Sequence, residues 1–409
     1  MGYDKRSQWF MIQNNPVQGP LQNMSFSDQD LVTFAKDWSA RLPERSLEIE
    51  SGRRLPPDIS RAFAAGGLFH ALVPAELGGS EVHPSTLVEM IKQVSIGDGS
   101  AGWNVMIGAT TGLLSASLSD EYAKKIYGSG PDVLSVGVTA PMGTAQSVEG
   151  GYKVTGRWPF GSGSQNAQWI SGGSFIFDGD TQRLGKGGVP ELQLMMFERD
   201  QVDIEDTWYV SGLRGTGSHH FSVTEQFVPD GRSVVLGGRT RIKRPLYQFP
   251  MLGLLALGVS SVSLGIGFKA LEAFKQLAGT KTATGGVKSL AERAQVQSIV
   301  GESTADLESA EAYIHSVIGD AYEMASQGRR LPKEIKAGLR LAAVNATHRS
   351  VAAVDRLYQA GGGSSIYENS VLQRCFRDIH VTTQHIMVAA PIYEVVGRVQ
   401  MGLDPRSLL

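Results

Sequence analysis

The spacing of apolar residues changes twice along this chain, and that order constrains the fold more than any other feature of the sequence. Residues 27–128 repeat apolar residues at helical spacing, as in SDQDLVTFAKDWSARL, whose leading Ser and Asp are typical of a helix N-terminus. Residues 133–236 contain short runs rich in Val, Phe, Ile and Thr between Gly, Asp and Pro, which indicates a β-sandwich or barrel. From residue 249 helical spacing returns in four long segments, which favours an antiparallel four-helix bundle.

This order predicts an α+β fold with three domains, and a length of 409 residues is compatible with two or three. We expect an N-terminal helical domain at residues 1–130, a middle β domain at 131–244 and a C-terminal four-helix bundle at 245–409. The bundle helices are expected at residues 251–278, 289–327, 332–360 and 367–400.

Composition argues against a nucleic-acid or membrane partner. The net charge of −2 lacks the basic surplus that phosphate binding needs, and the one dense basic run, GGRTRIKR at 237–244, is expected to be a solvated loop. The most apolar segment, FPMLGLLALGVSSVSLGIGFKALEAF at 249–274, is long enough to suggest a membrane span. Because Gly, Ser and Pro occur throughout it and an amphipathic stretch follows, we expect a buried core helix.

The single cysteine, Cys375, excludes an intrachain disulfide and favours a reducing compartment, so we expect a cytoplasmic protein. The opening MGYDKRSQWFMIQNN has no apolar core of signal-peptide length. No metal site is expected, because His219 and His220 are neighbours on a predicted strand and point to opposite faces. Neither a P-loop nor a Rossmann fingerprint precedes a helix, so no independent dinucleotide domain is expected.

Four stretches, considered together, carry a family resemblance. They are GLFHALVPAELGGSE at 67–81, GVTAPMGTA at 137–145, YKVTGRWPFGSGSQNAQW at 152–169 and GLRGTGSHHFSVTEQFVP at 212–229. In order and spacing they resemble the acyl-CoA dehydrogenase superfamily across nearly the whole chain. The resemblance implies one of two chemistries. Dehydrogenases use a glutamate to take the α-proton of an acyl-CoA, whereas the oxygenase components of two-component (group D) flavin-dependent monooxygenases, such as phenol and hydroxyphenylacetate-type hydroxylases, use reduced flavin and dioxygen.

The stretch RCFRDIHVTTQHIMVAAPIYEVVGRVQ at 374–400 distinguishes the two branches. Arg377-Asp378 resembles the dehydrogenase pair that precedes the catalytic glutamate by about two helical turns, but the matching place holds His385. Glu394 lies 394 − 378 = 16 residues after Asp378, which is too far, so we interpret it as a carboxylate on a helix face. The oxygenase branch places a histidine at this position on the last long helix, over the flavin. An imidazole titrates near neutral pH and can act as a base or a hydrogen-bond donor.

The resemblance implies further contacts around the flavin and substrate. Ser162 is the second catalytic candidate, as a hydroxyl that contacts the flavin. The other candidates are flavin contacts at Thr139, Trp158 and Phe160, substrate-pocket walls at Trp103 and Ile107, and contacts to the flavin of a neighbouring subunit from Arg293, Gln297, Gly361 and Gly362. His380, five residues before His385, projects from a different side of the helix and is not assigned a role.

The sequence therefore predicts the oxygenase component of a two-component flavin-dependent monooxygenase that hydroxylates a small aromatic molecule, in particular a phenol, through a flavin C4a-hydroperoxide. Reduced FMN or FAD, not covalently bound, would come from a separate NAD(P)H-dependent flavin reductase, and a homotetramer is expected. The choice between FMN and FAD stays open. So do three alternatives: an acyl-CoA dehydrogenase with a displaced base, an N-oxygenase of the same fold, and a relative that has lost flavin.

Overall fold

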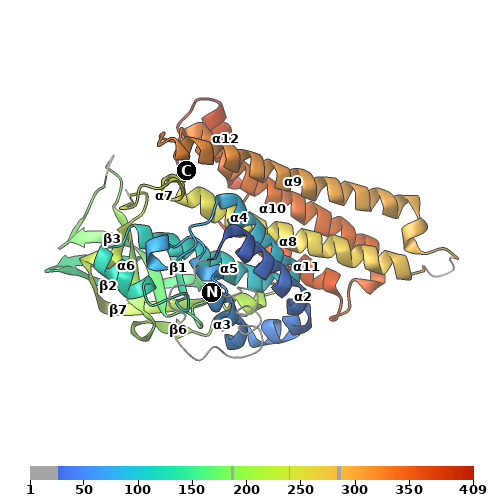
Figure 1. Ribbon diagram of the computed structural model, residues 1–409, viewed down its shortest axis with the longest axis horizontal. Coiled ribbons are helices and arrows are strands. Elements are labelled where there is room, and N and C mark those ends of the chain that lie inside the picture. Colours follow the sequence, from blue (N-terminus) through green and yellow to red (C-terminus); the bar gives the residue numbers. More distant parts are fainter. Residues whose placement is uncertain (1–25, 186–187, 239, 283–286) are drawn as a thin grey trace, which may run out of the picture.

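The computed structural model describes residues 26–185, 188–238, 240–282 and 287–409. A sheet occupies one end of the molecule, and the long helices of the C-terminal part run side by side toward the other (Figure 1). The opening stretch MGYDKRSQWFMIQNN, in which no signal-peptide core is expected, lies outside the described residues. The order of helices, sheet and helices confirms the order predicted from the sequence.

The N-terminal part is helical, as predicted. Its main helices are α2 (Asp28–Gly52), α3 (Pro57–Ala65), α4 (Pro84–Gly97), α5 (Gly99–Gly112) and α6 (Asp120–Tyr127). The start of α2 is a capping box, in which the Ser27 hydroxyl accepts from the Asp30 N–H and the Asp30 carboxylate accepts from the Ser27 N–H. Asp98 caps α5 by accepting from the Ala101 N–H at 3.0 Å. This cap fixes where α5 begins, and α5 carries two of the predicted pocket residues.

The middle part forms one mixed sheet in the described residues. Its strands are β1 (Ser135–Val148), β2 (Gly151–Gly161), β3 (Trp169–Asp178), β4 (Thr181–Gln182), β5 (Leu192–Glu198), β6 (Asp203–Glu205), β7 (His219–Pro229) and β8 (Ser233–Val235). The strand order is β6-β7-β2-β1-β3-β5-β8, with β4 beside β3, and only the β1–β3 pair is parallel. The prediction of a sandwich or barrel is therefore corrected: hydrogen bonds join the strands into a single sheet whose ends do not pair.

Two of the register irregularities in this sheet lie at neighbouring places. β1 changes register against β3 around Pro141, and β2 changes register against β7 between Trp158 and Gly161. Proline cannot donate to a strand ladder, and a bulge turns the following side chains in new directions. Phe160, directly after a proline on β2, has a φ of 65°. Both irregularities border the cavity described below.

In its described residues, the C-terminal part contains five α-helices after the short α7 (Pro245–Gln248). They are α8 (Met251–Thr280), α9 (Ala294–Ser326), α10 (Lys333–Gly361), α11 (Val371–Thr382) and α12 (Pro391–Gln400). The prediction of one helix at 367–400 is wrong, because α11 ends at Thr382 and α12 begins only at Pro391. A proline disfavours helical geometry in the residue before it, which is consistent with a break here. His385 consequently lies on the connecting segment 383–390 rather than on a helix.

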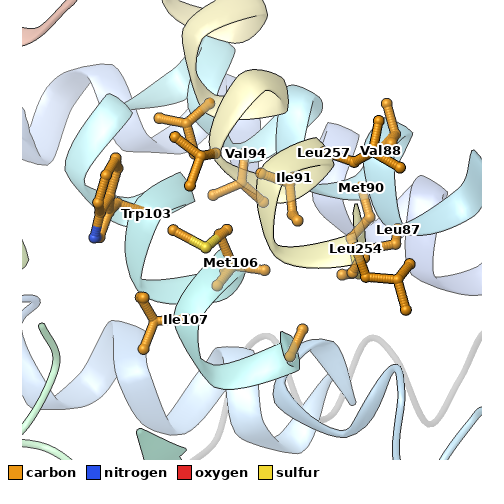
Figure 2. Close-up of a cluster of buried hydrophobic side chains, with 14 of the residues drawn as sticks. Leu87, Val88, Met90, Ile91, Val94, Trp103, Met106, Ile107, Leu254 and Leu257 are labelled. Atoms are coloured by element: carbon orange, nitrogen blue, oxygen red, sulfur yellow. The ribbon is translucent and has the colours of Figure 1, made fainter. Parts of the chain in front are cut away.

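A single cluster of buried apolar side chains runs through all three regions, from Phe26 to Val388. Figure 2 shows side chains of α4, α5 and α8 packed together, with Trp103 and Ile107 set apart along one side of α5. Helix α8 is long and apolar enough to cross a membrane by composition, but 78% of its most apolar window is buried inside the protein. This burial fits the core helix expected from the sequence. The residue limits of the three domains stay a prediction, because the core does not divide at them.

Candidate active site

A cavity of ≈ 670 Å³ lies where α5, the irregular parts of β1 and β2, and the segment 383–390 meet. This volume falls in the range of about 300–1,000 Å³ that is usual for small-molecule sites. The described residues that line it include no Asp, Glu, Lys or Arg, and most of the wall is apolar. The cavity therefore suits an uncharged, largely apolar molecule.

The cavity brings together six of the residues singled out in the sequence. They are Trp103, Ile107, Thr139, Phe160, Ser162 and His385. They come from four separate parts of the chain, which the fold alone unites. Trp158, Arg293, Gln297, Gly361 and Gly362 do not line it.

His385 is held in one tautomer by its own loop. Its Nδ1 accepts a hydrogen bond from the Met387 backbone N–H at 3.2 Å, so the neutral ring carries its hydrogen on Nε2. Burial, and to a smaller extent the positive charge of Arg340, lowers the pKa of His385 to about 4. The ring meets the indole of Trp103 edge-on, with centroids 5.6 Å apart. At neutral pH this side chain is an uncharged hydrogen-bond donor.

Arg340, on α10, binds the main chain of the same segment, 383–390. Its guanidinium donates to the Met387 carbonyl at 3.4 Å, and only 3% of the residue is exposed. No carboxylate in the described part of the chain pairs with it, and burial lowers the pKa of Arg340 to about 10. The peptide groups of Met387 are thus bound on one side by His385 and on the other by Arg340.

Ser162 begins a chain of buried hydroxyl groups. Its Oγ accepts from the Trp103 indole N–H at 3.0 Å and lies 2.6 Å from the Ser218 Oγ. The Ser218 Oγ lies 2.7 Å from the Thr216 Oγ1, which donates to the Leu213 carbonyl at 2.8 Å. Trp103 therefore connects the two catalytic candidates, with His385 on its ring and Ser162 on its nitrogen.

Phe160 and Trp208 form an aromatic wall at the cavity. Phe160 is 63% exposed, and its ring stands nearly perpendicular to that of Trp208, at 86° and 6.2 Å between centroids. A positive φ is rare for a bulky residue and is found where the surrounding structure imposes it, often at functional sites. Together with the irregular main chain at Thr139 and the acceptor at Ser162, this wall fits the planar ring of a flavin.

Trp158 has a structural position instead of the flavin contact that was predicted. Its indole is fully buried, stacks on Phe221 at 5.1 Å and donates to the Gly173 carbonyl at 2.7 Å. A Cβ at Gly143 or Gly172 would come within 2.4 or 2.5 Å of this ring, so the glycines make the slot that it fills. A ring enclosed in this way does not reach the cavity.

The four residues predicted to contact a neighbouring subunit's flavin lie at one end of the bundle. Arg293 and Gln297 are exposed at the start of α9, and Gly361 and Gly362 are at the end of α10. Figure 1 shows this end of α9 and α10 on the side away from the sheet. Their role within an assembly stays a prediction.

Three further residues lie away from the cavity. Glu394 is exposed on α12, and His380 Nε2 lies 3.0 Å from the Asp355 carboxylate. Cys375 is buried, and burial raises the pKa of its thiol to about 12. Neither the alternative base nor the thiol is placed to act on a molecule in the cavity.

Among the described residues, one group outside the cavity has donor atoms close enough for a metal ion: Glu89, Glu311 and His315. Lys92 Nζ lies 2.7 Å from the Glu89 carboxylate and also pairs with Glu311. The ammonium group already supplies the positive charge that these carboxylates attract. His219 and His220 do lie on a strand, β7, where successive side chains face opposite sides.

Sequence reasoning missed several residues of the site. Thr216 and Ser218 lie in the quoted GTGSHH stretch, but nothing in that pattern distinguishes them from ordinary turn residues. Trp208 lies in the irregular segment before β7. Arg340 lies in a helical pattern, where a charged residue normally faces solvent. Only the tertiary contacts assign these residues to the site.

Comparisons with known proteins place this geometry among flavoenzymes. The family model for the C-terminal domain of acyl-CoA dehydrogenases matches residues 257–390. The indole-3-acetate monooxygenase of Pseudomonas putida is 34% identical over 88% of this chain and 90% of its own length.

Solved structures agree with this placement. The HsaA oxygenase subunit of a flavin-dependent monooxygenase from Mycobacterium tuberculosis is 30% identical over 92% of this chain and 96% of its own. Its crystal structure matches with a TM-score of 0.85 over 94% of this chain and 100% of that chain, at 26% identity. XiaF from Streptomyces sp., in complex with FADH2 and glycerol, has a TM-score of 0.85 and 25% identity, covering 93% of this chain and 97% of that one.

Proposed function

The chain belongs to the oxygenase components of flavin-dependent monooxygenases that share the acyl-CoA dehydrogenase fold, and from this we propose that it hydroxylates a small, uncharged aromatic molecule. Its cofactor is flavin, which a separate NAD(P)H-dependent reductase would deliver in reduced form. The observation that carries the proposal is a neutral histidine facing an aromatic-walled cavity whose described lining contains no charged side chain.

When bound, reduced flavin supplies the electrons that activate dioxygen, so that one oxygen atom passes to the substrate and the other leaves as water. Phe160 and Trp208 would pack on the ring system, and Ser162 would accept a hydrogen bond from it. His385 has a single available group, the Nε2–H, which would donate to the oxygen of dioxygen or of a phenol. Of the two roles predicted for His385, the geometry supports the donor.

The acyl-CoA dehydrogenase alternative requires a catalytic base, and the described lining of the cavity contains no carboxylate that could act as one. Abstraction of an α-proton needs a carboxylate at the flavin, but no described lining residue is Asp or Glu, and Glu394 points to solvent from α12. His385 is a poor substitute for that carboxylate, because its Nδ1 already accepts from the Met387 N–H and its Nε2 carries the hydrogen, so the ring has no free acceptor. The apolar walls and the donor favour oxygen transfer.

The charge of the lining also bears on the substrate. Transfer of a carboxylate into an apolar cavity without a cation is strongly unfavourable. The relative from P. putida is named for indole-3-acetate, a carboxylate substrate, whereas the described lining here offers no Lys or Arg to receive one. A phenol is uncharged at neutral pH, and its hydroxyl can accept from the Nε2–H of His385 or bind the hydroxyls of Thr110 and Ser171.

Paired substrates test this assignment. The protein, chemically reduced FMN or FAD and oxygen would be combined with indole or indole-3-acetate, and with phenol or 4-hydroxybenzoate, and the products separated by chromatography. Hydroxylation of the neutral member of each pair, with little of the acid, is expected. Preferential turnover of the acids would contradict an uncharged substrate, and no oxygenation of any aromatic would contradict the function.

The assembly that suits this function is a cytoplasmic homotetramer. Arg293 and Gln297 at the start of α9, with Gly361 and Gly362 at the end of α10, would bind the flavin of a neighbouring subunit. Arg293, Gln297 and Gly362 are exposed at the end of the bundle and are therefore accessible to another chain, whereas Gly361 is buried. A glycine turn lets the main chain approach a ligand closely, and Gly362 has a φ of 57°.

A further inference from the structure

We propose that the hydroxyls of Ser218 and Thr216 fix Ser162 as a hydrogen-bond acceptor toward the cavity, and that this polarity makes the site select reduced over oxidised flavin. The inference rests on the proposed function, in which Ser162 accepts a hydrogen bond from the flavin, and it takes N5 as the flavin atom that donates. Ser218 and Thr216 act here as positioning residues, because they work through Ser162.

The direction of each hydrogen bond follows from the last acceptor. A carbonyl cannot donate, so the 2.8 Å contact to the Leu213 oxygen uses the hydrogen of the Thr216 hydroxyl. Thr216 then has only lone pairs for Ser218, which must donate across 2.7 Å. Ser218 in turn has only lone pairs for Ser162, which must donate across 2.6 Å. The three hydroxyl hydrogens therefore all point away from Ser162.

This order leaves Ser162 with one function toward the cavity. Its hydrogen is used by Ser218, and one lone pair receives the Trp103 N–H at 3.0 Å. The second lone pair remains for a molecule in the cavity. Ser162, Ser218 and Thr216 are 4%, 3% and 1% exposed, so bulk water does not compete for these bonds and their polarity is held.

The oxidised and reduced states of flavin differ in whether N5 can donate a hydrogen bond to the acceptor of Ser162. Reduced flavin carries a hydrogen on N5, whereas the oxidised N5 has a lone pair in that place. The lone pair of Ser162 therefore accepts a hydrogen bond from the N5–H of reduced flavin. In oxidised flavin the same lone pair faces the lone pair of N5, and a buried polar atom is left without a hydrogen bond. An oxygenase that receives reduced flavin and must release oxidised flavin gains from that difference at both steps.

The test compares the dissociation constants of both redox states. In S218A the Ser162 hydroxyl is free to turn and donate to the oxidised N5, so the ratio of the oxidised to the reduced dissociation constant is expected to fall about five- to tenfold. T216V, which removes the terminal hydroxyl at nearly constant shape, is expected to lower the ratio in the same direction. T216S keeps the hydroxyl and is expected to retain the wild-type ratio.

The titrations use full-length protein, with oxidised FMN and FAD in air and chemically reduced FMN and FAD under anaerobic conditions. S164A is the matched control, because the Ser164 hydroxyl is buried nearby, has no hydrogen-bond partner in the described part of the chain and does not line the cavity. Thermal unfolding of each variant identifies misfolded protein, and T216V carries the test if S218A does not fold.

Flavin binding with an unchanged ratio in both folded variants would overturn the inference while leaving the proposed function intact. Wild-type protein that binds flavin in neither state would instead remove the proposed function and, with it, the premise used here.

Discussion

At the scale of single residues, we propose that His385 decides which branch of the family chemistry this chain performs. Its place on the cavity wall agrees with the sequence prediction, but its surroundings sharpen the role. With Nδ1 occupied by the Met387 N–H and the pKa lowered to about 4, the ring offers a hydrogen and no free acceptor at neutral pH. The residue is therefore suited to donate a hydrogen bond and poorly suited to take a proton.

Substitution separates these two roles. His385→Gln keeps an N–H donor of similar reach, whereas His385→Ala removes it. We expect the alanine variant to bind flavin normally but to lose about 10²-fold in hydroxylation, with the reducing equivalents released as hydrogen peroxide. The glutamine variant is expected to retain more of the wild-type hydroxylation activity than the alanine variant does.

The ratio of hydroxylated product to hydrogen peroxide measures this effect directly. His380→Ala is the matched control, because that imidazole pairs with Asp355 away from the cavity. An alanine variant at position 385 with a wild-type product ratio would remove the residue from the mechanism.

At the scale of elements, α10 positions the loop that carries His385. Arg340 binds the Met387 carbonyl, and its charge disfavours a second positive charge on the nearby imidazole. In Arg340→Met the pKa of His385 is expected to rise above about 4 but to stay below its ordinary value near 6.5, because burial is the larger cause of the shift and is retained. The variant ring would then gain a proton as pH falls through that interval, while the wild-type ring stays neutral down to about pH 5.

Nitrogen chemical shifts of the imidazole, followed from pH 8 to 4, check this prediction. Arg349→Met serves as the control on the same helix, because Arg349 pairs with Asp306 on the exposed side. Identical titration of His385 in both variants would show that Arg340 has no electrostatic influence on it. The buried His70, whose pKa burial also lowers to about 4, must be assigned separately.

Elements also show how far the sequence could predict this molecule. The order of helices and strands followed from periodicity, and α8 and α10 begin and end within two residues of expectation, because each is a long apolar pattern bounded by Pro or Gly. The break after Thr382 was missed, although Pro391 signalled it. The hydroxyl chain could not be predicted, since Ser162 and Ser218 are 56 residues apart and meet only through strand pairing. Trp158 was misplaced because a strand residue can face either side of the sheet.

At the scale of the whole molecule, the predicted cross-subunit contacts lie at the end of the bundle away from the sheet (Figure 1), and none of them lines the cavity. If each flavin is held by two chains, a variant defective in the cavity and a variant defective at Arg293 should complement each other. His385→Ala and Arg293→Ala are each expected to hydroxylate poorly. A mixed assembly of the two is expected to regain activity. In some of its sites the intact cavity of an Arg293→Ala chain lies beside the intact Arg293 of a His385→Ala chain.

Refolding or co-expression of the two variants, followed by product analysis, measures this complementation. Glu302→Ala, at an exposed position farther along α9, is the control for Arg293→Ala. This variant is expected to hydroxylate without a second kind of chain. Mixed assemblies that stay as inactive as the parents would contradict a flavin site shared between chains.

The central claim is that this cavity transfers an oxygen atom from dioxygen to a neutral aromatic ring by means of reduced flavin. The most direct measurement supplies chemically reduced flavin, a neutral phenol and isotopically labelled dioxygen to the purified protein, and determines the label in the product by mass spectrometry. We predict that one labelled oxygen atom enters the ring product and that none enters from labelled water. Unlabelled product, or bleaching of oxidised flavin by an acyl-CoA without any reductant, would contradict it.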